Sequence, residues 1–158
     1  MKLVDIVKLI SLILLSQAAG VAGSVFTVSS IPTWYQTLEK PFFTPPNWLF
    51  APVWLVLYTL MGIAAFLVLK KGFSQKRVKV ALWIFTAQLI LNALWSVIFF
   101  GLRNPLWGFV EIVILWFAIL LTIVYFYRVS KPAGLILIPY ILWVTVASAL
   151  NFFVLILN

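Results

Sequence analysis

Cysteine and histidine are absent from this sequence of 158 residues, and acidic residues are scarce. Without cysteine the chain forms no disulfide bond, and without either residue it lacks the thiolate and imidazole ligands typical of zinc, haem and iron–sulfur centres. We therefore expect no metal site and no bound cofactor. Only 9% of the residues are charged and 65% are hydrophobic, which leaves too few polar side chains to cover a water-soluble globule.

The hydrophobic residues gather in long runs, each long enough to cross the ~30 Å hydrocarbon core of a bilayer as a helix. The five runs cover residues 9–29, 47–69, 80–102, 106–127 and 133–158. Backbone in lipid must satisfy its own hydrogen bonds, and continuous rather than alternating apolarity favours helices over barrel strands. The first run is too long for the core of a signal peptide. The sequence therefore predicts an all-α fold, a single domain over 1–158 with five transmembrane helices.

The formal charge of +8 is distributed unevenly between the two sides that five spans define. Nine of the eleven basic residues fall before the first span, after the second and after the fourth, whereas Lys40 and Arg103 fall on the other side. By the positive-inside rule we expect a cell-membrane protein with a cytoplasmic amino terminus and an external carboxyl terminus. The basic cluster at 70–77 then sets topology and contacts anionic lipid, so we expect no nucleic-acid partner.

The connection at 30–46 is much longer than the others and is rich in proline and aromatic residues. Proline restricts the backbone and aromatic side chains favour the membrane interface, so we predict a structured lid across the mouth of the bundle. An interfacial anchor without a ligand role is the alternative. The candidate lid residues are Trp34, Lys40, Pro41, Pro45 and Pro46.

Polar and aromatic residues recur at helical spacing inside three of the spans. Gln88, Asn92 and Trp95 share one face of the third span, because they are separated by about one turn each. The second span carries Trp54 and Tyr58 on one stripe, and the fifth carries Tyr140, Trp143, Ala147 and Asn151. An amide without a partner in hydrocarbon costs several kcal/mol, so these faces should point into the bundle.

Helical rise places the polar faces at similar depth, in the half of the bundle beneath the lid. They predict an apolar cavity with aromatic walls and a few amide and phenol groups, suited to a flat hydrophobic ligand that stacks on indole rings. Glu111 is the only acid inside a span and is either functional or paired structurally with Arg103 or a helix end. Ser16, Gly20 and Ser24 form a stripe of small residues for close packing against a neighbouring helix or a second subunit.

Several motifs, in order along the whole chain, resemble the TspO/MBR family of translocator proteins and tryptophan-rich sensory proteins. The first loop and second helix read Trp34-Tyr35-x-x-Leu38-x-Lys40-Pro41-x-x-x-Pro45-Pro46, with Phe50, Pro52, Trp54 and Tyr58 following. Two further motifs are Gln88-Leu89-x-Leu91-Asn92-x-x-Trp95-Ser96 and Pro139-Tyr140-x-x-Trp143-x-x-x-Ala147-x-x-Leu150-Asn151. The resemblance implies a five-helix bundle, often dimeric, that binds porphyrins such as protoporphyrin IX and, in animal members, cholesterol and benzodiazepine-type ligands.

By this resemblance the ligand site would contain residues from the loop and from three helices, namely Tyr35, Trp54, Asn92, Trp95, Tyr140, Trp143 and Ala147, with Tyr58 and Gln88 added by their helical faces. Trp54 and Trp143 resemble the tryptophans implicated in porphyrin chemistry, so they are the candidate catalytic residues. One departure concerns sterol: Leu150-Asn151-Phe152 lacks the tyrosine and the following basic residue of animal members.

Three functions follow from these expectations. The leading hypothesis is a membrane-embedded sensor or carrier of porphyrin-like tetrapyrroles, because stacking aromatics are present and no hydrolytic triad or nucleotide loop is found. The second is an enzyme that degrades protoporphyrin in light through its tryptophans. The third is a regulatory subunit of a membrane complex. A homodimer in the lipid bilayer is the expected assembly.

Overall fold

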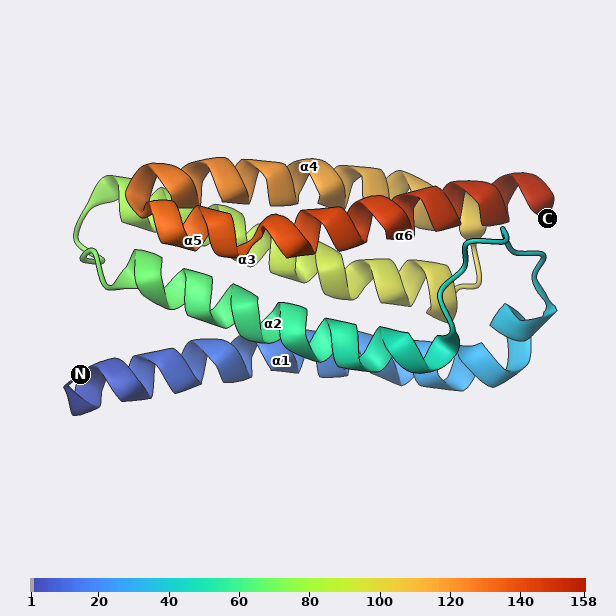
Figure 1. Ribbon diagram of the computed structural model, residues 1–158, viewed down its shortest axis with the longest axis horizontal. Coiled ribbons are helices and arrows are strands. Elements are labelled where there is room, and N and C mark those ends of the chain that lie inside the picture. Colours follow the sequence, from blue (N-terminus) through green and yellow to red (C-terminus); the bar gives the residue numbers. More distant parts are fainter. Residues whose placement is uncertain (1) are drawn as a thin grey trace.

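The computed structural model describes residues 2–158 and consists of helices joined by short links (Figure 1). In chain order these are α1 (Leu3–Ser30), η1 (Ile31–Tyr35), α2 (Asn47–Leu69), α3 (Lys76–Ser96), η2 (Val97–Gly101), α4 (Pro105–Val129), α5 (Lys131–Ile136) and α6 (Ile138–Leu157). The π-helical turns η1 and η2 continue α1 and α3, and α5 leads into α6. Five of the resulting rods are long and apolar enough to cross a membrane.

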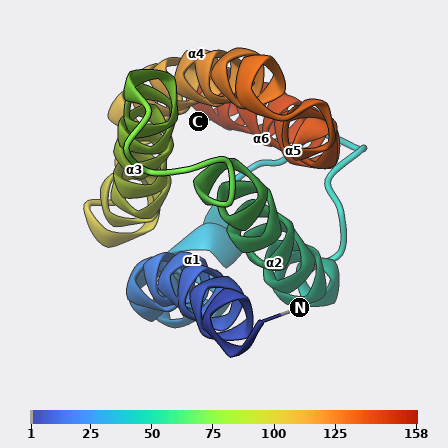
Figure 2. The ribbon, with the colours of Figure 1, turned by 90° about the vertical axis from the view of Figure 1, so that its left-hand side faces the viewer.

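The rods form a ring when the bundle is viewed end-on (Figure 2). α1 packs on α2 and α3, α4 packs on α3, and α4 also packs on α5 and α6. The ring closes where α2 meets α5, whereas α2 makes only sparse contact with α6. The wall formed by α2 and the α5–α6 rod is therefore closely packed where α2 meets α5 and loosely packed where α2 runs beside α6.

The residues between Tyr35 and α2 lie at one end of the bundle, together with Asn158 and the link between α3 and α4 (Figure 1). We call this the lid end, and we call residues 36–46 the lid segment. The segment expected as a loop from residue 30 is helical up to Tyr35, because η1 continues α1 past Pro32, and the missing N–H of this proline coincides with the change from α-helical to π-helical turns. The irregular chain is thus shorter than the sequence predicts.

The other spans differ from the sequence expectation mainly at their ends. α2 coincides with the run at 47–69, while α1 begins before residue 9 and α3 begins before residue 80, because polar and basic residues continue the helix beyond the apolar stretch. The last run contains a break at Leu137, where Pro139 follows and lacks the N–H that a continuous helix would use.

Candidate functional site

Helices α1 and α2 come into close backbone contact at Gly62, in the half of the bundle away from the lid end. A Cβ atom added to Gly62 would lie 2.5 Å from the Cα of Ile13, so only glycine permits this approach of the two backbones. Nearby, the Gln17 side-chain amide donates hydrogen bonds to the carbonyl of Leu55 at 2.9 Å and to the hydroxyl of Thr59 at 3.0 Å. These contacts fix one end of the α1–α2 pair.

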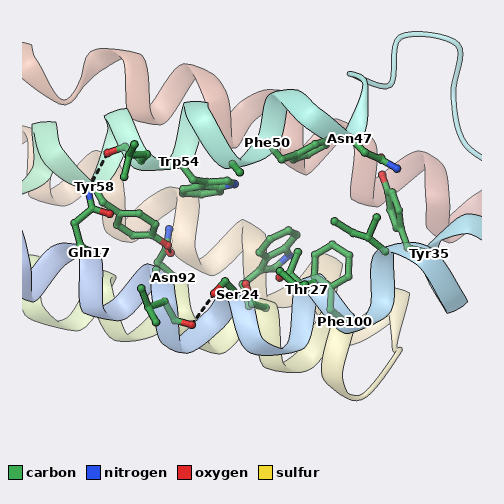
Figure 3. Close-up of a pocket in the computed structure, with 18 residues that line it drawn as sticks. Gln17, Ser24, Thr27, Tyr35, Asn47, Phe50, Trp54, Tyr58, Asn92 and Phe100 are labelled. Carbon is green, nitrogen blue, oxygen red and sulfur yellow. Dashed lines mark hydrogen bonds between the residues drawn. The ribbon is translucent and has the colours of Figure 1, made fainter.

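Toward the lid end a cavity of about 270 Å³ lies between α1, α2 and α3 (Figure 3). Its wall comes from all three helices and from both π-helical turns. The lining residues are Gln17, Gly20, Val21, Ser24, Thr27, Val28, Ile31, Tyr35, Asn47, Phe50, Ala51, Trp54, Leu55, Tyr58, Asn92, Trp95, Ser96 and Phe100. Val21, Val28 and Leu55 are more than half exposed, so the cavity opens sideways between α1 and α2 toward the surrounding hydrocarbon.

Aromatic rings form much of the cavity wall. Trp54 stacks on Tyr58 with ring centroids 5.4 Å apart and an interplanar angle of 29°. On the α3 side, Trp95 stacks on Phe99 at 5.6 Å and 13°. Flat faces of this kind provide a large contact area for a planar ligand at little cost in side-chain entropy.

A chain of four hydrogen-bonded side chains closes the inner end of the cavity. The Tyr58 hydroxyl donates to the Asn92 side-chain oxygen, the Asn92 amide donates to the Tyr140 hydroxyl at 2.8 Å, and Tyr140 donates to the Gln88 side-chain oxygen at 2.9 Å. All four residues are buried. The chain links α2, α3 and α6 and satisfies polar groups that lipid could not satisfy.

The lid segment begins over the rim of the cavity. Tyr35 is buried and packs against Phe100 with centroids 5.6 Å apart. The Lys40 ammonium donates to the carbonyls of Tyr35 at 2.8 Å and Leu38 at 2.7 Å and lies 4.8 Å from the centre of the Tyr35 ring. Lys40 therefore holds the chain just after η1 in a tight turn.

The remaining lid residues shape the path of the chain into α2. Trp34 packs on Phe99 at 5.5 Å, and the carbonyl of Pro41 accepts two hydrogen bonds from Thr44 in a turn. Pro45 is half-buried, and Pro46 caps the start of α2 in an extended conformation. The prolines thus stiffen the lid segment where it returns to the bundle.

A second hollow lies on the opposite side of α2, facing α6. It is a shallow groove of about 640 Å³, lined by Pro52, Val53, Val56, Leu57, Leu60, Pro139, Leu142, Trp143 and Val146. Trp143 forms part of this groove and does not line the cavity. Its indole N–H is buried and has no hydrogen-bond partner among residues 2–158, and its ring packs edge-on against Phe50 at 5.9 Å and 71°.

The structure brings together some of the residues that the sequence singled out and leaves others apart. Five line the cavity: Tyr35, Trp54, Tyr58, Asn92 and Trp95. Gln88 and Tyr140 support it from below through hydrogen bonds, Ala147 is buried outside the cavity lining, and Trp143 lies in the groove. Trp143 faces the groove, and Phe50, which lines the cavity, packs edge-on against it.

The contribution of α1 to the cavity was missed by the sequence reasoning. Gln17, Gly20, Ser24 and Thr27 all line it, spaced three or four residues apart on one face. The sequence predicts the stripe of small residues only as a packing surface. The neighbouring Gly23 does serve packing, since it lies against Ser96 of α3, but the small residues of α1 also leave the space that the cavity occupies.

Two further residues are now placed. Glu111 is buried, and within the described chain neither of its carboxylate oxygens has a hydrogen-bond partner, so the alternative of a structural pairing with Arg103 is not formed. The Trp116 indole donates to the Thr145 hydroxyl at 2.8 Å and joins α4 to α6. Neither side chain lines the cavity or the groove.

The sequence matches the family model described as TspO/MBR family over residues 12–157. A tryptophan-rich protein TspO from Archaeoglobus fulgidus is 53% identical over 155 residues, which cover 98% of this chain and 99% of that protein. The translocator protein of Homo sapiens is 40% identical over 132 residues, covering 82% and 78%. A tryptophan-rich sensory protein from Cereibacter sphaeroides is 33% identical over 136 residues, covering 85% and 83%.

The family match extends over nearly the whole chain, and the five apolar rods account for the same residues. The relatives come from an archaeon, a bacterium and an animal, so the similarity is not confined to one lineage. This chain is a multi-pass membrane protein of the TspO/MBR family.

Proposed function

We propose that this protein binds flat hydrophobic ligands within the membrane, with porphyrin-like tetrapyrroles such as protoporphyrin IX as the leading class, and serves as their sensor or carrier. The observation that carries the proposal is the stacked pair of Trp54 and Tyr58 in the wall of a cavity that opens toward lipid. A planar ligand entering from the hydrocarbon would meet an aromatic face of matching shape.

The chemistry of the lining favours binding over acid–base catalysis. Among the described residues the lining contains no charged side chain, and its polar groups are hydroxyls and amides. General acid–base catalysis needs a titratable group placed against the reacting atoms. Amides and phenols instead orient a ligand by hydrogen bonds, which suits a site that holds its ligand without changing it.

The names of relatives agree with a ligand-handling role without specifying it here. The human relative is named a translocator protein, and the Cereibacter relative is named a tryptophan-rich sensory protein. Transport and sensing both require reversible binding. We infer that the lid segment regulates access to the cavity from the side of the carboxyl terminus, which the charge distribution places outside the cell.

We also propose that the protein is a homodimer. Gly20 and Gly23 of α1 lie against Tyr58 and Ser96 of the same chain. The small residues of α1 therefore contribute little to the dimer interface. A dimer would then use other lipid-facing surfaces, such as the outer face of α1, where Leu14 and Val25 are exposed.

The test is a titration of the purified protein in nanodiscs with protoporphyrin IX, followed by the Soret absorbance of the pigment. Trp54→Ala removes the stacking face and should weaken binding about tenfold or more, as expected for a central aromatic contact. Trp83→Ala is the matched control, because Trp83 is 73% exposed on α3 and lines neither hollow. Equal affinity of the wild type and Trp54→Ala would contradict the proposal.

A further inference from the structure

Glu111 is a buried acid that the proposed function does not use. Only 5% of its surface is exposed, and neither carboxyl oxygen has a hydrogen-bond partner among residues 2–158. It lies on the inward face of α4 with Gly108, Ile112 and Leu115, about 9 Å from the lid end of that helix. Ionisable residues at membrane depth are rare and mark functional sites.

Contacts between α4 and α6 fix the level at which Glu111 lies. Phe109 packs on Phe152 with ring centroids 5.5 Å apart, and the Trp116 indole donates to the Thr145 hydroxyl at 2.8 Å. The two helices run antiparallel, and both pairs have the same register (Figure 1). Because Glu111 lies between Phe109 and Trp116, it is level with residues 150–151 of α6.

The polar side chain of α6 at this level is Asn151, which is buried and already bonded. Its oxygen accepts from the Trp95 indole at 3.2 Å, and its amide donates to the carbonyl of Ala147 at 2.9 Å. On the α3 side, Phe99 packs against α4 one turn before Glu111. We call this region between α3, α4 and α6 the seam. Its polar groups bond to one another and not to the acid.

No cation among the described residues is placed to neutralise Glu111. The helices α2, η2 and α6 contain no charged residue. The charged residues of α3 and α5 lie at the start of each helix, at the end of the bundle opposite the lid, and are Lys76, Arg77, Lys79 and Lys131. Arg128 is about 25 Å away along α4, and Arg103 is exposed on the link before α4. The hydroxyls of Tyr58 and Tyr140 donate to other side chains.

A carboxylate in these surroundings would be a buried charge without a partner. An isolated anion in an apolar medium is disfavoured far more strongly than the neutral acid, so such a group binds a proton instead. The proton also turns the carboxyl into a hydrogen-bond donor. The Asn151 oxygen accepts only one bond from Trp95 and retains a second lone pair at the same level.

We propose that Glu111 is an internal proton-binding site, which holds one proton while the seam is closed and releases it when the seam opens. The proton resides on a carboxyl oxygen and leaves to the water that enters the opened seam, so no further reactant is required. The inference goes beyond the proposed function, because Glu111 lines neither the cavity nor the groove.

Trp95 connects the seam with the cavity. Its ring lines the cavity, and its indole N–H bonds to Asn151 in the seam. Opening of the seam therefore alters one wall of the cavity. Because opening releases a proton, alkaline conditions favour it and acidic conditions oppose it.

The absence of histidine allows this proton to be counted. Between about pH 5 and 7 ordinary aspartate and glutamate side chains are already ionised, whereas tyrosine and lysine titrate above this range. Glu111 loses its proton when the chain unfolds, so the equilibrium constant for unfolding should rise about tenfold per pH unit. Chemical unfolding in dodecyl maltoside micelles, followed by circular dichroism, measures the slope. A wild-type constant that does not change with pH would overturn the proposal.

Glu111→Gln keeps the shape of the side chain and removes the titrating group, so its unfolding constant should not depend on pH in this range. Glu39→Gln is the matched control, because Glu39 is exposed in the lid segment, and it should retain the wild-type slope. A slope that persists in Glu111→Gln would place the proton on another group and refute the assignment.

Infrared spectroscopy detects the bound proton without unfolding the protein. In dodecyl maltoside, which has no carbonyl group, the wild type at pH 7 should show the C=O stretching band of a protonated carboxylic acid, and the band should shift in heavy water. Glu111→Gln should lack the band and Glu39→Gln should retain it. If the wild type shows carboxylate bands alone, Glu111 is charged and the proposal is wrong, whether or not protoporphyrin IX binds.

Discussion

Asn92 joins three helices through one amide group. Its oxygen accepts from Tyr58 of α2 and its nitrogen donates to Tyr140 of α6, while Asn92 itself belongs to α3. Asparagine can do this because one small side chain carries both a donor and an acceptor. Replacement by an apolar residue of similar size leaves both tyrosine hydroxyls short of a partner in a place that water does not reach.

Asn92→Leu should lower the free energy of unfolding by about 2–4 kcal/mol, because two buried polar groups lose partners at ~1–3 kcal/mol each. Chemical unfolding in detergent micelles, followed by circular dichroism, measures the difference. Thr86→Ala is the control, because Thr86 is exposed on the same helix and its hydroxyl donates to the carbonyl of Leu82 within that helix. If both variants unfold alike, the amide does not hold the helices together.

Gly62 acts at a different point, where α1 crosses α2 at close range. Gly62→Ala should destabilise the bundle by about 1–3 kcal/mol, because the added methyl group would meet the Ile13 backbone, which cannot move independently of α1. Gly23→Ala is the matched but milder change, since its added atom meets the Ser96 hydroxyl at 3.0 Å and the Ser96 Cβ at 3.1 Å, contacts that a shift of a few tenths of an ångström relieves. Thermal unfolding of the two variants should therefore differ by several degrees.

The lid segment is joined to α6 by a reciprocal pair of hydrogen bonds. The Glu39 N–H donates to the Asn158 side-chain oxygen at 3.0 Å, and the Asn158 amide donates to the Glu39 carbonyl at 3.0 Å. Phe43 adds an edge-on contact with Phe153 at 5.5 Å. The segment thus spans from the α1 side of the bundle to the end of α6.

Removing the Asn158 side chain should loosen this element without unfolding the bundle. In Asn158→Ala we expect the Glu39 amide to exchange its hydrogen about tenfold faster, because its acceptor is lost and the site is exposed to water. Hydrogen exchange read by mass spectrometry of the loop peptide provides the measurement. Gln36→Ala is the control. Unchanged exchange in Asn158→Ala would mean that the proline turns alone order the segment.

At the scale of the whole molecule, the distribution of charge between the two ends predicts its orientation. Because the native chain has no cysteine, single cysteines can be introduced without background labelling. In intact cells, Phe42→Cys at the lid end should react with a membrane-impermeant maleimide, since Phe42 is fully exposed. Ser74→Cys, between α2 and α3, should react only after the membrane is opened. The reverse pattern would invert the assigned topology.

Sequence reasoning reached the architecture but only part of the site, for identifiable physical reasons. Long apolar runs determine helices in lipid almost by themselves, so the five spans could be predicted closely. Polar residues in those runs must face inward, which is why Asn92, Tyr58 and Trp95 were assigned to the interior. The rotation of α6 relative to α2 depends on packing between side chains far apart in sequence, and helical periodicity alone could not place Trp143 on the groove side of Phe50.

Helices α1 and α2 are in contact at the Gly62 crossing, and toward the lid end the cavity separates them. The Gly62 crossing and the Gln17 hydrogen bonds are the pivot. A thicker or thinner bilayer changes the tilt that each helix prefers. Because the two helices are held together at this pivot, a change of tilt changes the distance between them at the lid end. We therefore expect ligand affinity in this protein to follow the acyl-chain length of the membrane around it.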